Sequence, residues 1–361
     1  MSSLTPERFA RLHPVHHMIF DYLSQSSPYL VLRLNKYHRR RIIPNLYHTF
    51  TITTKSLGAF DCGLTGEDPL LPLAINQVKV LRVVNTESAI LFEHLRLRDD
   101  ERWVFPLHLR DDERGVFPLR LRDDERGVFP SELKVVRVEF SWAVIRDGYF
   151  LRIQGRLGDV GKYTILEEVA RSDHLAEALV HVDCGDEWAS HDSNELGCIP
   201  WMFHDRSVDI NTTIVLHAPT HGRIYFPLGE RLPLPSPSTL RFVLWSTPEK
   251  KEQIHPGDPR PIPIPPPGVL EDFARFIALS TAALEQDWVE ASLYPGEVLE
   301  EGFVYPLAIE VVCPSPIYVE ELARTFYRPD QRKAKGFDWA PRFRKLDREL
   351  VDNYDLWSTK M

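Results

Sequence analysis

The stretch TTIVLHA, residues 212–218, consists almost entirely of apolar and β-branched residues. Five further runs share this character: VKVLRVV at 78–84, LKVVRVEF at 133–140, ALVHVDC at 178–184, TLRFVLWS at 239–246 and LAIEVVC at 307–313. Strands that are apolar almost throughout are typical of a parallel sheet with both faces covered. The sequence therefore predicts an α/β fold with a mostly parallel sheet.

Helical patterns alternate with these runs, most clearly at Val269–Asp287 and at Tyr318–Phe326. Strand followed by helix favours right-handed crossover units, and we assign the α/β domain to residues 51–330. The spacing of the units is irregular, so two architectures stay open: an open doubly wound sheet, or a degenerate leucine-rich arc. The run LRVVN, ending at Asn85, faintly resembles the leucine-rich signature.

Two segments inside this domain depart from the pattern. Residues 95–130 hold three near-identical copies of twelve residues, LRLRDDERWVFP, LHLRDDERGVFP and LRLRDDERGVFP. Their near-identity indicates a recent duplication, so we expect one native copy and two surplus copies looped out at the surface. Residues 256–268, PGDPRPIPIPPPG, predict a stiff extended surface loop, with a docking segment for an aromatic groove as the alternative.

The last segment, residues 331–361, alternates charges in RFRKLDRELVDNYDLW. Its apolar residues Phe343, Leu346 and Leu350 fall at helical spacing. We therefore expect a charged C-terminal helical tail, packed on the surface through that stripe with Trp357 beneath it.

The composition excludes several classes of protein. The 361 residues carry a formal net charge of −9, which argues against a nucleic-acid binder. No apolar run approaches the ~18 residues needed to span a membrane, and the first residues lack the pattern of a signal peptide. The cysteines, scattered without a C-x-x-C pair, suit a reducing compartment. We expect a cytoplasmic or nuclear protein.

Two motifs suggest chemistry but lack the required spacing. In GRLGDVGKYT, residues 155–164, five residues separate Gly155 from Gly161, and Tyr163 stands where a phosphate-binding loop needs a metal-binding hydroxyl. A second group has zinc-competent residue types without the tight spacing of a zinc site: His181, Asp183, Cys184, Asp186, His191, Cys198 and His204. We therefore expect no enzyme activity, cofactor or metal; an α/β hydrolase or nucleotide-binding enzyme is the alternative.

Residues 10–50 predict three short helices. In the first, Val15, Met18, Ile19, Tyr22 and Leu23 form one apolar stripe at helical spacing. The second begins after the break SQSSP and ends in a run of arginines at 39–41. The third is expected to open at Pro44 and to carry Leu46, Tyr47 and Phe50.

A proline ahead of IFDYL, a Ser-Ser-Pro break, a leucine-rich second helix with a basic end, and IIPNLYHTF together resemble a divergent F-box. The segment departs from the family at VHH (15–17), LNK (34–36) and Tyr47. The resemblance implies docking on the Skp-type adaptor of a cullin ubiquitin ligase, through Pro14, Ile19, Phe20, Leu23 and Leu30.

This resemblance predicts a non-enzymatic interaction protein that recruits an unidentified protein target to the ligase. The alternative is a structural or interaction protein whose N-terminal helices only cap the α/β domain.

Overall fold

A computed structural model of the chain gives the fold. The structure describes residues 18, 22–23, 42–44, 46–53, 55–56, 77–85, 88, 134–144, 174–186, 210–219, 224–226, 237–246, 261–293, 308–327 and 341–356. The repeat segment 95–130, the glycine-rich turn 155–164 and Trp357 lie outside these residues.

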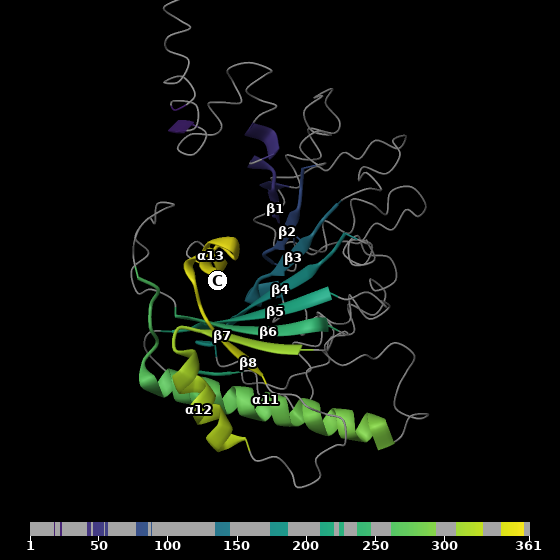
Figure 1. The fold of residues 1–361 in the computed structure, drawn as a ribbon. Coiled ribbons are helices and arrows are strands. Elements are labelled where there is room, and N and C mark those ends of the chain that lie inside the picture. Colours follow the sequence, from purple (N-terminus) through teal and green to yellow (C-terminus); the bar gives the residue numbers. More distant parts are fainter. Residues whose placement is uncertain are drawn as a thin grey trace, which may run out of the picture.

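One sheet of eight parallel strands organises the described part of the chain (Figure 1). All six strands predicted from the sequence are confirmed, and two short strands join them at the edges. The strands are β1 (Thr49–Ile52), β2 (Val80–Val83), β3 (Arg137–Phe140), β4 (Glu177–Asp183), β5 (Ile210–Ala218), β6 (Pro237–Ser246), β7 (Ala308–Cys313) and β8 (Arg342–Lys345).

The strand order in the sheet follows the order in the chain, from β1 to β8. A doubly wound sheet needs a point at which the strand order reverses, because its two halves grow in opposite directions from the first strand. The described strands contain no such reversal, since each new strand is added at the same edge. This order does not agree with the doubly wound alternative.

Helices lie on both sides of the sheet (Figure 1). The long helix α11 (Pro267–Leu293) and the helix α12 (Pro316–Phe326) cover one face, whereas α13 (Arg348–Asn353) lies on the other. Both helices predicted in the α/β domain are confirmed, with α11 extending beyond its predicted limits in each direction. Pro267 opens α11, a position where a missing backbone N–H costs no helical hydrogen bond.

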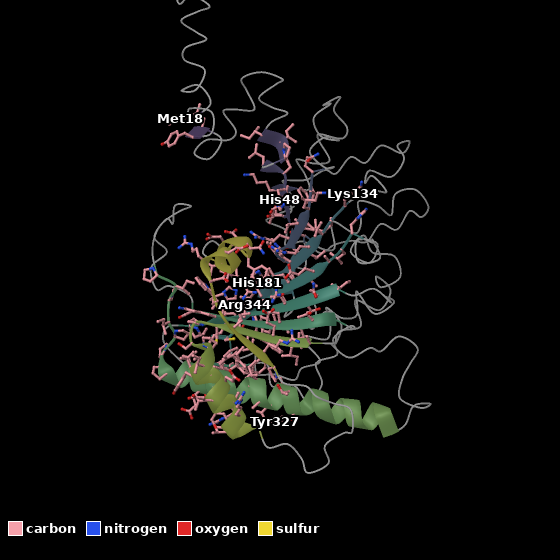
Figure 2. The ribbon with its side chains drawn as sticks, viewed as in Figure 1. Met18, His48, Lys134, His181, Tyr327 and Arg344 are labelled. Carbon is pink, nitrogen blue, oxygen red and sulfur yellow. The ribbon has the colours of Figure 1, made fainter. Side chains whose placement is uncertain are left out.

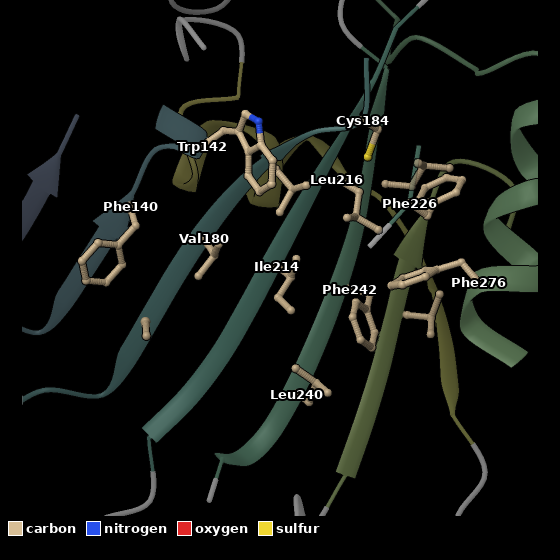
Figure 3. Close-up of a cluster of buried hydrophobic side chains, with 14 of the residues drawn as sticks. Phe140, Trp142, Val180, Cys184, Ile214, Leu216, Phe226, Leu240, Phe242 and Phe276 are labelled. Carbon is tan, nitrogen blue, oxygen red and sulfur yellow. The ribbon is translucent and has the colours of Figure 1, made fainter. Parts of the chain in front are cut away.

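Aromatic side chains fill the core between the sheet and α11 (Figure 3). The Phe276 ring stacks on Phe226, with centroids 5.3 Å apart, and meets the ring of Phe242 edge-on at 5.4 Å. Phe273 joins the same group, at 5.9 Å from Phe226. Stacked and edge-on pairs of this kind add to the burial of large apolar surface, so this cluster anchors α11 to the sheet.

Two helix predictions at the ends of the sheet are wrong in their extent. Residues 42–44 and 46 are helical, and Leu350 lies in α13, but one apolar residue assigned to each helix lies in a strand instead. Phe50, expected in a third N-terminal helix, lies in β1, and Phe343, expected in the tail helix, lies in β8. In β8 the half-buried Phe343 stands between the exposed Arg342 and Arg344, which is the two-residue period of a strand. The tail helix begins only at Arg348.

The proline-rich segment is described from residue 261, and residues 261–266 form neither helix nor strand before α11 begins. Its Ile262 packs against the apolar cluster under α13, so this part of the loop contacts the sheet domain. Among the described helices, none combines the length and hydropathy required to cross a membrane.

Candidate functional site

The sheet face that carries α13 is lined with charged side chains, and we call it the charged face. The strand register places these residues beside one another: Arg82 of β2 next to Glu139 of β3, and Arg241 of β6 next to Glu310 of β7. Arg137 of β3 stands next to Glu177 of β4. The two charges in each of these pairs are opposite in sign, which is the favourable cross-strand arrangement.

These charges form a continuous chain of ion pairs across the sheet. Glu139 accepts from the Arg82 guanidinium at 2.6 Å and lies 3.6 Å from that of Arg137, which donates to Glu177 at 2.8 Å. Arg241 continues the chain, at 3.7 Å from Glu177 and 2.6 Å from Glu310.

The chain of ion pairs ends on the segment after β7. Arg344 of β8 lies 3.5 Å from Glu310 and 3.0 Å from Asp347, the residue whose side chain caps the N-terminus of α13. At the opposite end of the chain, Asp355 lies 3.4 Å from Arg82. The residues that flank α13 therefore close both ends of the network.

Burial makes the network more than a set of surface pairs. The Glu139 side chain is only 2% exposed, and those of Arg137 and Glu177 are 13% and 14% exposed. Burial alone would lower the pKa of Arg82, but the charge and hydrogen bond of Glu139, together with those of Asp355, outweigh it and raise that pKa. Arg82 therefore stays charged, as the buried carboxylate beside it requires.

Tyr354, which follows α13, is inserted into the middle of this network. Its hydroxyl donates to Glu177 at 2.7 Å and accepts from Arg241 at 2.6 Å, while the Arg137 guanidinium lies 5.0 Å from the ring centroid. Burial, followed by the charge of Glu177, raises the Tyr354 pKa. The phenol therefore keeps its proton and can donate to the carboxylate.

Beside the charges, the same face carries a small apolar cluster. Leu350, Val351, Tyr354 and Leu356 pack there against sheet residues, namely Leu179, Val215, Val243, Trp245 and Val312. The face is therefore both charged and apolar, and residues 347–356, which we call the C-terminal segment, cover part of it.

Two histidines are buried in β4 and β5. His181 Nδ1 lies 2.9 Å from His217 Nε2, and the two residues are 3% and 1% exposed. Burial lowers the pKa of His217 to about 3. Burial, then His217 and Arg82, lower the pKa of His181 well below its usual value. Both rings are therefore neutral near pH 7, and one N–H donates to the other ring.

The described residues of the predicted zinc-competent group do not come together. His181 belongs to the face that carries α13, whereas Cys184 is buried in the core on the α11 side. Asp183 accepts from the Gly185 amide at 2.8 Å, and Asp186 accepts from the Trp142 indole at 3.0 Å. Within the described residues, no three His, Cys, Asp or Glu side chains could hold a metal ion. The other members, His191, Cys198 and His204, lie outside the described residues.

The described cysteines are buried and carry no disulfide. Burial raises the pKa of Cys313 to about 12, and burial followed by the charge of Asp183 raises that of Cys184. Because the thiolate is the reactive form, these two thiols are poor nucleophiles.

Of the predicted adaptor-binding residues, only Leu23 is described; Pro14, Ile19, Phe20 and Leu30 lie outside the described residues. Leu23 is half-buried and packs with Leu46 against Ile42. Met18 and Tyr22, one helical turn apart, are 72% and 69% exposed. The predicted apolar stripe therefore has an inward part at Leu23 and an outward part at Met18 and Tyr22, and Met18 lies well apart from the sheet (Figure 2).

Comparison with known proteins gives one match. The family model DUF3760, described as a protein of unknown function, matches residues 9–52, the segment that ends with β1. No curated protein and no solved structure matches the chain.

Proposed function

We propose that this chain is a non-enzymatic interaction protein that recruits a protein target to a cullin-type ubiquitin ligase. In this proposal the N-terminal segment, residues 10–50, binds a Skp-type adaptor, and the charged face of the sheet holds the target. Neither role requires a catalytic residue, because the protein acts by bringing its two partners together.

The observation that carries the proposal is the exposure of Met18 and Tyr22 on the first N-terminal helix. Two large apolar side chains one turn apart form a continuous patch on a helix. Such an exposed patch is a candidate contact for another protein. The opposite, inner side of the same segment must be packed to keep the patch in place. Leu23 and Ile42 pack together on that inner side. The Tyr47 amide donates to the Ile43 carbonyl at 2.9 Å, just before the chain enters β1.

The sheet supports the second half of the proposal. We infer that it is a degenerate leucine-rich arc, since eight parallel strands in sequential order are the arrangement of such arrays. Arrays of this kind expose one long face to partners. The charged face supplies fixed charges of both signs, which suit the recognition of a protein segment.

Adaptor capture by purified full-length chain tests the proposal. Met18→Asp/Tyr22→Asp places two charges in the proposed contact and should reduce copurification with a Skp-type adaptor at least about a hundredfold, because a desolvated contact tolerates no unpaired charge. Ile317→Asp is the matched control: Ile317 on α12 is also an exposed apolar residue, at 74%, and capture should not change.

Far-UV circular dichroism of each variant separates loss of binding from loss of fold. Wild-type protein that captures no adaptor at micromolar concentrations of both would contradict the proposal and leave the N-terminal helices as a cap. Equal losses in the double variant and in the Ile317→Asp control would contradict it as well.

A further inference from the structure

The C-terminal segment, residues 347–356, makes contacts with the charged face that resemble those of a bound peptide. Its apolar residues Leu350, Val351 and Leu356 are buried among sheet side chains. They reach the sheet from a helix of only six residues, which is too short to be stable without such packing.

Three consecutive polar residues of this segment each contact a different part of the sheet. Asn353 accepts from the Arg137 guanidinium of β3 through its backbone carbonyl at 2.9 Å and its side-chain oxygen at 3.1 Å. Tyr354 reaches Glu177 of β4 and Arg241 of β6. Asp355 pairs with Arg82 of β2. The sheet thus contacts the sequence Asn-Tyr-Asp residue by residue.

The backbone at Asp355 ends α13 and turns the chain back onto the sheet. Its φ of 52° lies in the left-handed region, which is common just after a helix and which aspartate tolerates better than most residues. The Leu356 amide donates to the Val351 carbonyl at 3.1 Å and closes this turn. The turn places the Asp355 carboxylate at Arg82 and buries Leu356.

We propose that this face is a recognition site for a short helical segment of a partner protein. The segment carries two adjacent apolar residues, a tyrosine about one helical turn later and an aspartate directly after the tyrosine. The C-terminal segment occupies the site within the same chain and competes with that partner. The inference rests on the proposed function, because it names the class of target that the recruiting protein would hold.

Competition within the chain has a measurable consequence. A tethered segment acts at an effective concentration on the order of millimolar, so it outcompetes a free peptide of similar intrinsic affinity. The apparent affinity for a partner is reduced by the fraction of molecules in which the site is open. Weakening the contacts of the C-terminal segment should therefore increase binding of a partner peptide.

The probe is a labelled peptide with the sequence of residues 346–356, LDRELVDNYDL, titrated against full-length chain. Full-length Tyr354→Phe/Asp355→Asn should bind it at least about tenfold more tightly than wild type, because the tethered segment loses its hydroxyl and carboxylate contacts. Glu349→Gln is the control in the same segment: the Glu349 side chain on α13 is exposed, so peptide binding should not rise.

Two further peptides test the class of partner. A peptide that keeps only the counterparts of Leu350, Val351, Tyr354, Asp355 and Leu356, with alanine elsewhere, should bind the double variant. The same peptide with phenylalanine for the tyrosine should bind at least about tenfold more weakly, since Glu177 and Arg241 lose their shared partner.

The inference is overturned if the double variant keeps its circular dichroism spectrum but binds the peptide no better than wild type. Should that variant unfold, Asp355→Asn alone serves instead, because the Asp355 side chain is 49% exposed. Adaptor capture is measured on the same preparations. Capture without peptide binding overturns this inference alone, and peptide binding without capture overturns the adaptor proposal alone.

Discussion

At the scale of single residues, Glu139 is the charge on which the network depends most. Its side chain is 2% exposed and lies between the guanidinium groups of Arg82 and Arg137. A carboxylate removed from water to this extent is stable only while it is paired. The two arginines are themselves partly exposed, so solvent compensates them in part if the carboxylate is lost.

Glu139→Gln should therefore lower the free energy of unfolding by about 2 kcal/mol, since it replaces a charged hydrogen bond in a buried site by a neutral one. Glu320→Gln is the control, because Glu320 pairs with the 77% exposed Arg324 along α12, and its loss should cost less than about 0.5 kcal/mol. Urea denaturation measures both. Equal effects of the two substitutions would show that the network adds nothing to stability.

The histidine pair predicts a dependence of stability on pH. The pKa of His217 is lowered from 6.5 in the unfolded chain to about 3 in the fold. Because the folded pKa is the lower one, the unfolded state binds protons first as the pH falls below about 6.5. The stability conferred by the neutral ring is present above that pH and is lost progressively toward pH 3, at up to about 1.4 kcal/mol per pH unit.

His217→Gln removes this titration and should make the fall in unfolding free energy between about pH 6 and about pH 4 shallower by up to about 1.4 kcal/mol per unit. Chemical denaturation at several pH values gives the two slopes. Groups away from His217 cancel in the comparison, whereas His181, whose pKa His217 lowers, contributes to the difference. Identical slopes for variant and wild type would contradict the neutral state of the buried ring.

At the scale of elements, the strands that were predictable are those with long apolar runs and buried positions throughout. In β5, for example, eight of the nine residues are buried. Its sequence therefore lacks the polar stripe of an amphipathic helix. β1 and β8 have four residues each, of which one is buried in β1 and none in β8. Such short edge strands owe their conformation to pairing with β2 and β7 rather than to their own pattern.

The charged face was not predicted, although part of its signal is in the sequence. Arg82, Arg241 and Glu310 interrupt runs that are otherwise apolar, in LRVV, LRFV and IEVV. A charge at such a position suggests a partner on a neighbouring strand. The partner follows only from the register, which depends on the whole sheet. The place of Tyr354 in this network could not be predicted from the sequence, because its contacts join residues far apart in the chain.

The packing of α11 gives a prediction for one helix. Phe276→Ala removes a ring that contacts both Phe226 and Phe242, and should lower the free energy of unfolding by about 3–5 kcal/mol. Leu279→Ala on the same helix is the control, since Leu279 is 53% exposed and its loss should cost less than about 1 kcal/mol. If the two variants unfold at the same urea concentration, the aromatic cluster does not anchor α11.

At the scale of the whole molecule, the chain combines a sheet with two different faces and an N-terminal segment that leads into its first strand. We expect the surplus repeats to contribute nothing to this arrangement. The repeats lie between β2 and β3 in the sequence, and these two strands pair with each other. Deletion of residues 107–130 should therefore leave cooperative unfolding intact and change stability by only about 1 kcal/mol, the cost of a changed loop length. Loss of the cooperative transition in that variant would show that the copies are structural.

The central claim, that the N-terminal segment is an adaptor-binding module joined to a separate recognition sheet, is tested most directly by hydrogen exchange of the full-length chain. Amide exchange is measured with and without a saturating concentration of purified Skp-type adaptor. We predict slower exchange within residues 10–50, which include the exposed Met18 and Tyr22, and unchanged exchange in β4 to β7. Unchanged exchange throughout residues 10–50, or protection confined to the sheet, would contradict this claim.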